Sequence, residues 1–212
     1  MTYMILGVVV LAVSTVLNPF RIGKLQIIGV GQRMMLLKRV TFPDLIFPRW
    51  QSVLAVSLIG VLIGLDPRSH TMPPGVPAWL GVVMGGMGLV TTWVAFPIIV
   101  AVLRWWLKRG GRWDGQGDLF NLVAASWLVA DTLGAGLTAL GVPPLLTLPL
   151  WLYSVWVGAQ AIEGAIPQAS LGYCIAGIAI GLLPAIVAAG SMFALVGVLM
   201  VVTGLVPGGA GA

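Results

Sequence analysis

Long apolar runs, separated by short polar or proline-containing breaks, divide the chain. The runs cover residues 51–65, 76–107, 119–140, 145–162 and 171–206, and a shorter run covers residues 2–17. A helix needs about 20 apolar residues to cross the roughly 30 Å hydrocarbon core of a bilayer. The pattern therefore predicts an all-α fold, a polytopic transmembrane helix bundle with five or six spans.

The last apolar run is too long for one straight span, but no polar turn interrupts it. It contains Pro184 and the pair Gly190-Ser191, which are sites where a helix can bend. We favour one long kinked or tilted helix over a helical hairpin, which remains the alternative.

Residues 20–50 differ from the rest of the chain because basic and apolar side chains alternate irregularly. Its basic residues are Arg21, Lys24, Arg33, Lys38, Arg39 and Arg49. Charges are costly in the hydrocarbon core, whereas such a mixture suits a segment in the headgroup layer with its apolar side chains at the acyl boundary. We therefore divide the chain into an extra N-terminal transmembrane helix (1–19), an interfacial basic amphipathic segment (20–50) and a transmembrane bundle (51–207).

The composition excludes an ordinary cytosolic protein. Hydrophobic residues make up 59% and charged residues only 8%, with a mean hydropathy of +1.05, whereas soluble domains carry about 25% charged residues. The net charge is +5, and all but one of the 11 lysine and arginine residues lie in two clusters. This distribution is typical of membrane orientation and does not favour nucleic-acid binding.

The two basic clusters predict how the bundle is oriented. The second cluster consists of Arg104, Lys108, Arg109 and Arg112. Lysine and arginine concentrate in cytoplasmic loops, and two apolar runs separate the clusters, so both are expected at the cytoplasmic surface. The 66–74 loop and the 141–144 turn are then expected on the opposite side.

Two acidic residues accompany the later apolar runs. Asp131 lies near the middle of its run, and Glu163 lies at the cytoplasmic end of the next, where we place it at headgroup level. A mid-bilayer carboxylate must be neutral, paired or in a wet cavity. Asp131 is either a proton or cation site, or a packing residue bonded to Ser126, Thr138 or a neighbouring helix. We favour packing, because transporters usually show several such groups or matching broken helices.

Small residues at four-residue spacing let helix backbones approach closely in a membrane. The pairs are Gly60 with Gly64, Gly81 with Gly85, and Gly177 with Gly181. We interpret them as internal packing sites, with a subunit interface as the alternative. The tryptophans are interpreted as interfacial anchors, among them Trp50, Trp79, Trp105, Trp106, Trp113 and Trp151.

Nothing in the sequence predicts catalysis or a cofactor. The single histidine, His70, and the single cysteine, Cys174, have no partners at metal-ligand spacing. No serine-histidine-aspartate set or phosphate-binding glycine loop is present. We therefore expect no enzyme, no metal site and no bound cofactor.

The second half of the chain resembles the Yip family, the Rab- or Ypt-interacting type of membrane domain. The resemblance rests on the glycine-bearing loop 110–117, the segment 119–127, the Leu150-Trp151 pair and Glu163-Gly164 before a further apolar run. It is strongest over residues 110–184. It implies a non-enzymatic membrane protein of five helices, here of a bacterial type and placed in the inner membrane. The run 2–17 is extra, and without the long soluble arm of eukaryotic members GTPase binding is not expected.

The sequence thus predicts a structural or interaction component of the membrane. Its partners would be the lipid bilayer and another membrane protein, or further copies of itself, so that it could be an accessory subunit of a larger assembly. The alternative is a small transporter or channel built around Asp131.

Overall fold

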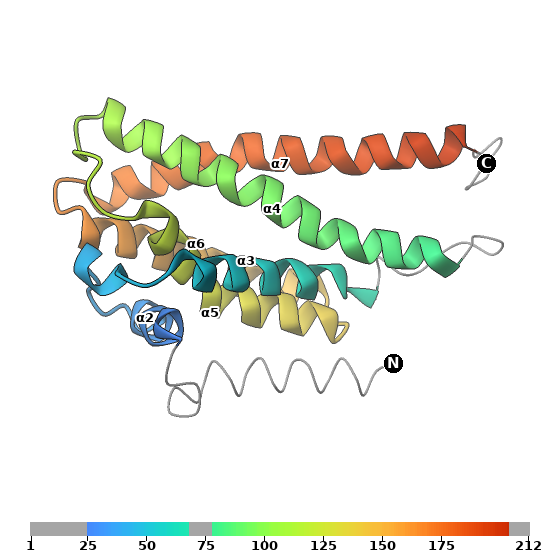
Figure 1. The fold of residues 1–212 in the computed structure, drawn as a ribbon, viewed down its shortest axis with the longest axis horizontal. Coiled ribbons are helices and arrows are strands. Elements are labelled where there is room, and N and C mark those ends of the chain that lie inside the picture. The colour runs from blue at the N-terminus through green and yellow to red at the C-terminus, as the bar shows by residue number, and fades with distance from the viewer. Residues whose placement is uncertain (1–24, 68–77, 204–212) are drawn as a thin grey trace.

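The computed structural model describes residues 25–67 and 78–203, and every structural statement below concerns these ranges (Figure 1). Within them the chain forms six α-helices, one short 3-10 helix and no strand, which confirms the all-α prediction. The elements in order are α2 (Gln26–Met35), η1 (Phe42–Leu45), α3 (Arg49–Gly64), α4 (Ala78–Arg109), α5 (Leu119–Ala139), α6 (Pro144–Ala165) and α7 (Leu171–Val202).

Four helices, α4 to α7, are long and apolar enough to cross a membrane. Helix α3 has only 16 residues, or about 24 Å at roughly 1.5 Å per residue, which is shorter than a bilayer core. The predicted helix in residues 2–17 lies outside the described part of the chain. The described residues contain four candidate membrane-spanning helices. The predicted total of five or six spans therefore remains a prediction.

The last apolar run forms one helix. Helix α7 continues for 32 residues through Pro184, so the preference for a single long helix is confirmed and the hairpin is wrong. No polar turn offers the backbone groups an alternative to the helix, and apolar surroundings penalise every unpaired N–H and C=O group.

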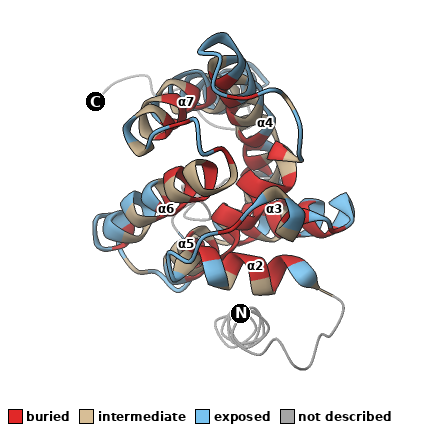
Figure 2. Cartoon of the chain, turned by 90° about the vertical axis from the view of Figure 1, so that its left-hand side faces the viewer, coloured by how far each residue is buried: buried red, intermediate tan, exposed pale blue. Residues whose placement is uncertain are grey.

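Helices α3 to α7 run roughly along the long axis of the molecule, and α2 lies across them (Figures 1 and 2). Helix α4 packs against α3 and α7, while α5 packs against α3, α6 and α2. The main core includes the fully buried Phe96, Leu103, Leu107, Leu122 and Ile162.

The apolar face of α2 packs against the protein. Ile27, Ile28, Val30 and Met34 are buried in the main core, and Gly31 lies directly against Ala125 of α5. These side chains do not face the acyl boundary as the sequence analysis expected, because the groove beside α5 provides an apolar surface within the protein. The exposed side chains of Lys38 and Arg39 remain available for a membrane surface, whereas Arg33 pairs with Asp44.

Glycines allow the close helix crossings. Gly60 and Gly64 of α3 lie against Leu89 and Gly85 of α4, and Gly177 and Gly181 of α7 lie against Trp106 and Ile99 of α4. Gly81 is half-buried in the first turn of α4. These crossings lie inside the chain, as expected for internal packing.

The two basic clusters share one end of the bundle. Arg33 pairs with Asp44 and Arg49 pairs with Asp118, each at 2.9 Å. Arg112 donates to the Gln168 carbonyl oxygen at 2.9 Å, which joins the second cluster to the loop before α7. We call this the basic end; in Figure 1 it is the left end. Arg21 and Lys24 lie outside the described residues, and Arg104, Lys108 and Arg109 are on the last turns of α4.

Candidate intramembrane site

Asp131 lies in the middle of α5 and is held by a neighbouring helix. The Ser154 hydroxyl of α6 donates to the Asp131 carboxylate, with 2.6 Å between Oγ and Oδ2. Among the described residues this is the carboxylate's only hydrogen bond, and neither of the two ion pairs there includes it. Asp131 thus points into the bundle with a partner on another helix, as predicted.

The partners named from the sequence are wrong. Ser126 donates to the Val123 carbonyl oxygen at 2.8 Å, and Thr138 donates to the Gly134 carbonyl oxygen at 3.0 Å. Both hydroxyls are close enough to their own helix to bond to the preceding turn, a common arrangement for serine and threonine in helices. Ser154, which does bond to Asp131, was not foreseen because residue spacing on one helix gives no register between two helices.

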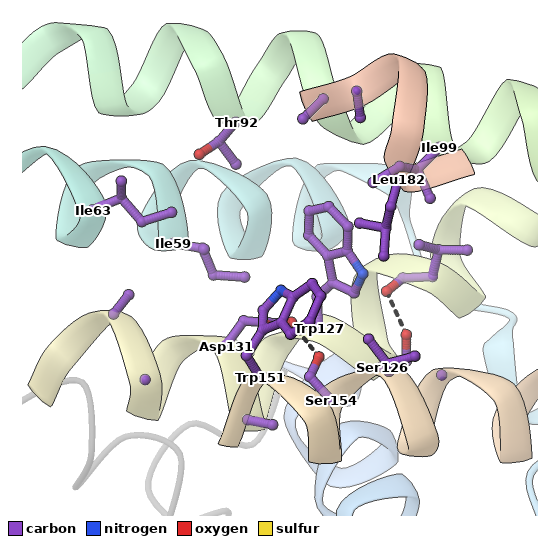
Figure 3. A pocket seen from close by; sticks show the side chains of 18 of the residues that line it. Ile59, Ile63, Thr92, Ile99, Ser126, Trp127, Asp131, Trp151, Ser154 and Leu182 are labelled. Carbon is purple, nitrogen blue, oxygen red and sulfur yellow. Dashed lines mark hydrogen bonds between the residues drawn. The ribbon is translucent and has the colours of Figure 1, made fainter. Parts of the chain in front are cut away.

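Asp131 is half-buried and faces a cavity of about 420 Å³ inside the bundle (Figure 3). All five long helices from α3 to α7 contribute to the lining. Apolar side chains predominate, such as Ile59, Ile99, Val155 and Leu182. The lining extends from Asp66, just after α3, to Leu103 and Ile162, where the packed core begins.

The polar part of the lining is a set of hydroxyl groups and carboxyl groups. It consists of Asp66, Thr91, Thr92, Ser126, Asp131, Thr138, Thr147 and Ser154. Most of these residues were not predicted as a group from the sequence, because they come from four separate segments. Their only sequence signal is that hydroxyl residues interrupt several otherwise apolar runs.

Two tryptophans flank the Asp131–Ser154 bond. Trp127 precedes Asp131 by one helical turn, and Trp151 precedes Ser154 by one turn, so each shares a face with its polar neighbour. Both rings line the cavity (Figure 3). Trp127 also packs edge-on against Phe96, with 5.1 Å between ring centroids. Trp151 is therefore part of the cavity wall as well as of the exposed surface. The interpretation of Trp151 as an interfacial anchor did not include this role in the cavity.

Glu163 stabilises the start of α7 at the basic end. Its carboxylate accepts a hydrogen bond from the Leu171 backbone N–H at 3.1 Å, at the first residue of α7. Helix N-termini have unpaired N–H groups and a positive dipole end, so a carboxylate stabilises them. Glu163 lies outside the lining of the cavity and therefore is not part of the Asp131 site.

Polar side chains that the sequence analysis did not select hold α2 and the loop after it. Gln51 accepts from the Ile27 backbone N–H at 3.1 Å, and the Tyr153 hydroxyl donates to the Met35 carbonyl oxygen. The buried Asn121 accepts from Ser52 and donates to two carbonyl oxygens of the loop 45–47. These bonds link segments that are far apart in sequence, so no local pattern predicts them.

Within the described ranges, no group of three or more histidine, cysteine, aspartate or glutamate side chains could hold a metal ion. Cys174 is a free thiol buried in α7. His70 lies outside those ranges. The cavity offers hydrogen-bonding groups, two carboxyl groups and aromatic rings for binding.

The comparisons with known proteins leave the family open. No family model, curated protein or solved structure matches the chain. The resemblance to the Yip family therefore stays a prediction from the sequence.

Proposed function

We propose that this chain is a multi-pass integral membrane protein, of the bacterial inner membrane, that binds a small molecule in the cavity around Asp131. Its basic end faces the cytoplasm in this proposal. The four apolar helices support membrane insertion, and the gathering of both basic clusters at one end supports the orientation.

The position of the Asp131 carboxyl group carries the proposal. A carboxyl group that served only packing would be enclosed by the partner helix, whereas Asp131 is half-buried and faces a cavity. The volume of about 420 Å³ falls in the range of ligand pockets, roughly 300 to 1,000 Å³. Such pockets are mainly apolar with a few polar groups, and this lining has that composition.

A binding protein or small carrier fits this cavity better than an open channel. Toward the basic end the lining stops at the packed core, where Phe96, Leu103 and Leu107 are almost completely buried. A solute could therefore reach Asp131 without a continuous path through the bundle. This proposal takes up the transporter alternative of the sequence analysis, and it assigns the protein no catalytic activity.

The test is to fill the cavity without disturbing the helices. A Cβ atom at Gly134 meets no other atom within 4 Å, and Gly134 lines the cavity, so Gly134→Leu should project into it. Gly197→Leu is the matched control, since Gly197 is exposed on α7 with equally free surroundings.

The probes are 1-adamantanol and 1-aminoadamantane, compact molecules that such a volume can accommodate. Purified protein in mild detergent should gain thermal stability with at least one probe. Gly134→Leu should abolish that gain and Gly197→Leu should retain it. If Gly134→Leu leaves the gain in thermal stability unchanged for both probes, neither probe acts through the cavity and the proposed function is wrong.

A second candidate function, a structural or accessory subunit, is favoured by α7. Only 6% of its most apolar stretch is buried within the chain. Exposed large side chains on it include Leu183, Ile186, Phe193, Leu195 and Leu199. A lipid-facing surface explains this exposure, and so does a partner helix. Disulfide cross-linking of a cysteine at Leu195 in native membranes distinguishes them: a defined cross-linked species supports the subunit role, and its absence opposes that role.

A further inference from the structure

We infer that the ligand of the cavity is an organic cation, a protonated amine with a compact apolar body, whose ammonium group contacts Asp131. This inference rests on the proposed function and names its ligand class. It follows from the hydrogen-bonding capacity of the lining, the position of the two tryptophans and the charge of the carboxyl group.

Five of the six hydroxyl groups in the lining donate their protons within the protein. Thr91 and Thr92 donate to carbonyl oxygens one turn earlier, at 2.7 and 2.8 Å, and Ser126 and Thr138 do the same. Ser154 donates to Asp131. A hydroxyl group has one donor and two acceptor lone pairs, so these groups offer only acceptor positions to a ligand. The donors of the lining are the indole N–H groups of Trp127 and Trp151, whereas the hydroxyl oxygens and the Asp131 carboxylate are acceptors. This excess of acceptors beside Asp131 favours a ligand that donates, and an ammonium group donates without accepting.

The aromatic rings favour the same ligand. Trp127 and Trp151 stand one helical turn from Asp131 and Ser154 and line the same cavity (Figure 3). The face of a tryptophan ring attracts a cation within about 6 Å of its centroid, more strongly where water is excluded. Because Trp127 is also packed against Phe96, its ring does not have to become ordered when a ligand binds.

The charge balance distinguishes a cation from a neutral donor. An ionised carboxylate in an apolar bundle is costly unless an opposite charge accompanies it. Within the described residues no lysine, arginine or histidine lines the cavity. An ammonium ligand would stabilise the ionised form of Asp131 by supplying the opposite charge, whereas an alcohol would not.

The depth of the site argues for a free amine over a lipid headgroup. Asp131 is twelve residues beyond Leu119, or about 18 Å along α5 at roughly 1.5 Å per residue. An aminophospholipid would have to bring its phosphate close to Asp131, into a lining with no basic residue within the described ranges. Like charges at that distance from water oppose this arrangement.

The experiment compares 1-aminoadamantane, which is protonated at neutral pH, with 1-adamantanol, which has nearly the same shape and no charge. Affinities are measured by calorimetry in a phosphatidylcholine nanodisc, so that no aminophospholipid competes. The parent protein should bind the amine at least about tenfold more tightly than the alcohol, as expected for a buried charged pair. Asp131→Asn should remove that selectivity. Asp114→Asn, in the loop at the basic end, is the matched control and should retain it.

The outcomes separate this inference from the proposed function. If the amine and the alcohol bind equally and Gly134→Leu blocks both, the cavity binds ligands but the organic-cation inference is wrong. If the amine is preferred and Asp131→Asn keeps the preference, Asp131 is not its contact and the inference is again wrong. If Gly134→Leu blocks neither probe, the proposed function fails and the inference fails with it. The comparison of the two probes on the parent protein stands even if a variant does not fold.

Discussion

The crossing of α3 and α4 leaves no room for a side chain at Gly88. A Cβ atom there would lie 2.8 Å from the Gly60 carbonyl oxygen and closer still to the Gly64 backbone. Backbone atoms cannot rotate away, so Gly88→Ala must push the two helices apart. Gly86, two residues earlier, points the other way and meets nothing within 4 Å. The same substitution at these two positions therefore should have opposite effects.

The expected magnitudes follow from the two environments. Overpacking a tight contact costs typically about 1 to 3 kcal/mol. Replacing glycine by alanine inside a helix returns about 0.5 to 1 kcal/mol of conformational free energy. Gly88→Ala should therefore lower the free energy of unfolding by about 1 to 2 kcal/mol, while Gly86→Ala should leave it unchanged or raise it by up to about 1 kcal/mol.

The assay is reversible unfolding in mixed micelles, titrated with a denaturing detergent and followed by circular dichroism. Both variants carry the same added methyl group, so differences in insertion or micelle binding largely cancel. The reasoning about the α3–α4 crossing is refuted if Gly88→Ala proves as stable as Gly86→Ala. It is also refuted if both variants lose the same stability, since that would indicate a general effect of alanine in α4.

Three further results are expected. Asn121→Ala should lower the free energy of unfolding by about 2 to 4 kcal/mol because it leaves buried hydrogen-bonding groups without partners. Ser191→Ala, at an exposed position of α7, should change it by less than about 0.5 kcal/mol. Similar losses in the two variants would contradict the stabilising role of the Asn121 hydrogen bonds. The pKa of Asp44 is lowered by the Thr41 backbone N–H and by Arg33. The ionised carboxylate therefore stabilises the fold above its ordinary pKa, and this stabilisation is lost as pH falls through the lower pKa of the folded state. Between about pH 5 and pH 3 the parent protein should lose more stability than Asp44→Asn, and parallel pH profiles of the two proteins would contradict this. Single cysteines at Gly111 and Leu140, in a cysteine-free background, should label from opposite sides of the membrane with an impermeant thiol reagent, and labelling from one side would overturn the orientation.

The sequence predicted the elements of this fold well, because long apolar runs leave the backbone few alternatives to helices. The 171–206 run illustrates this, since it forms a single helix that continues to Val202. The glycine pairs were also readable, because four-residue spacing places both members on one helix face. What the sequence could not provide was the register between helices. Ser154 lies 23 residues from Asp131, and Asn121 lies more than 70 residues from the loop it holds.

The clearest error of prediction concerns the apolar side chains of α2, which were expected to face lipid but pack against the protein. A basic amphipathic segment has the same pattern whether its apolar face meets lipid or protein, because both surroundings exclude water. The deciding features were the Gln51 side chain near the start of α2, the Tyr153 hydroxyl at its end, and Gly31, which permits close approach to α5. None of these three residues lies on a recognisable motif.

The hydrogen bonds of the two halves of the bundle differ in a way that bears on function. At the basic end they join distant segments: Asn121 to the 45–47 loop, Arg49 to Asp118, and Arg112 to Gln168. Around the cavity the hydroxyl groups of four residues bond within their own helices. Ser154 with Asp131 joins α6 to α5, and Trp93 with Ser57 joins α4 to α3.

A bond within one helix does not fix that helix relative to its neighbours. The helices around the cavity are therefore positioned mainly by van der Waals contacts at the glycine crossings, with polar links between α5 and α6 and between α3 and α4. Ser154 bonds to one carboxylate oxygen of Asp131, Oδ2, so a ligand that bonds to Asp131 shares the carboxylate with Ser154 and contacts the link between α5 and α6. Occupancy of the cavity can thereby change the relation of α5 to α6 while the basic end keeps its cross-segment bonds, which is the arrangement that a ligand-responsive membrane protein needs.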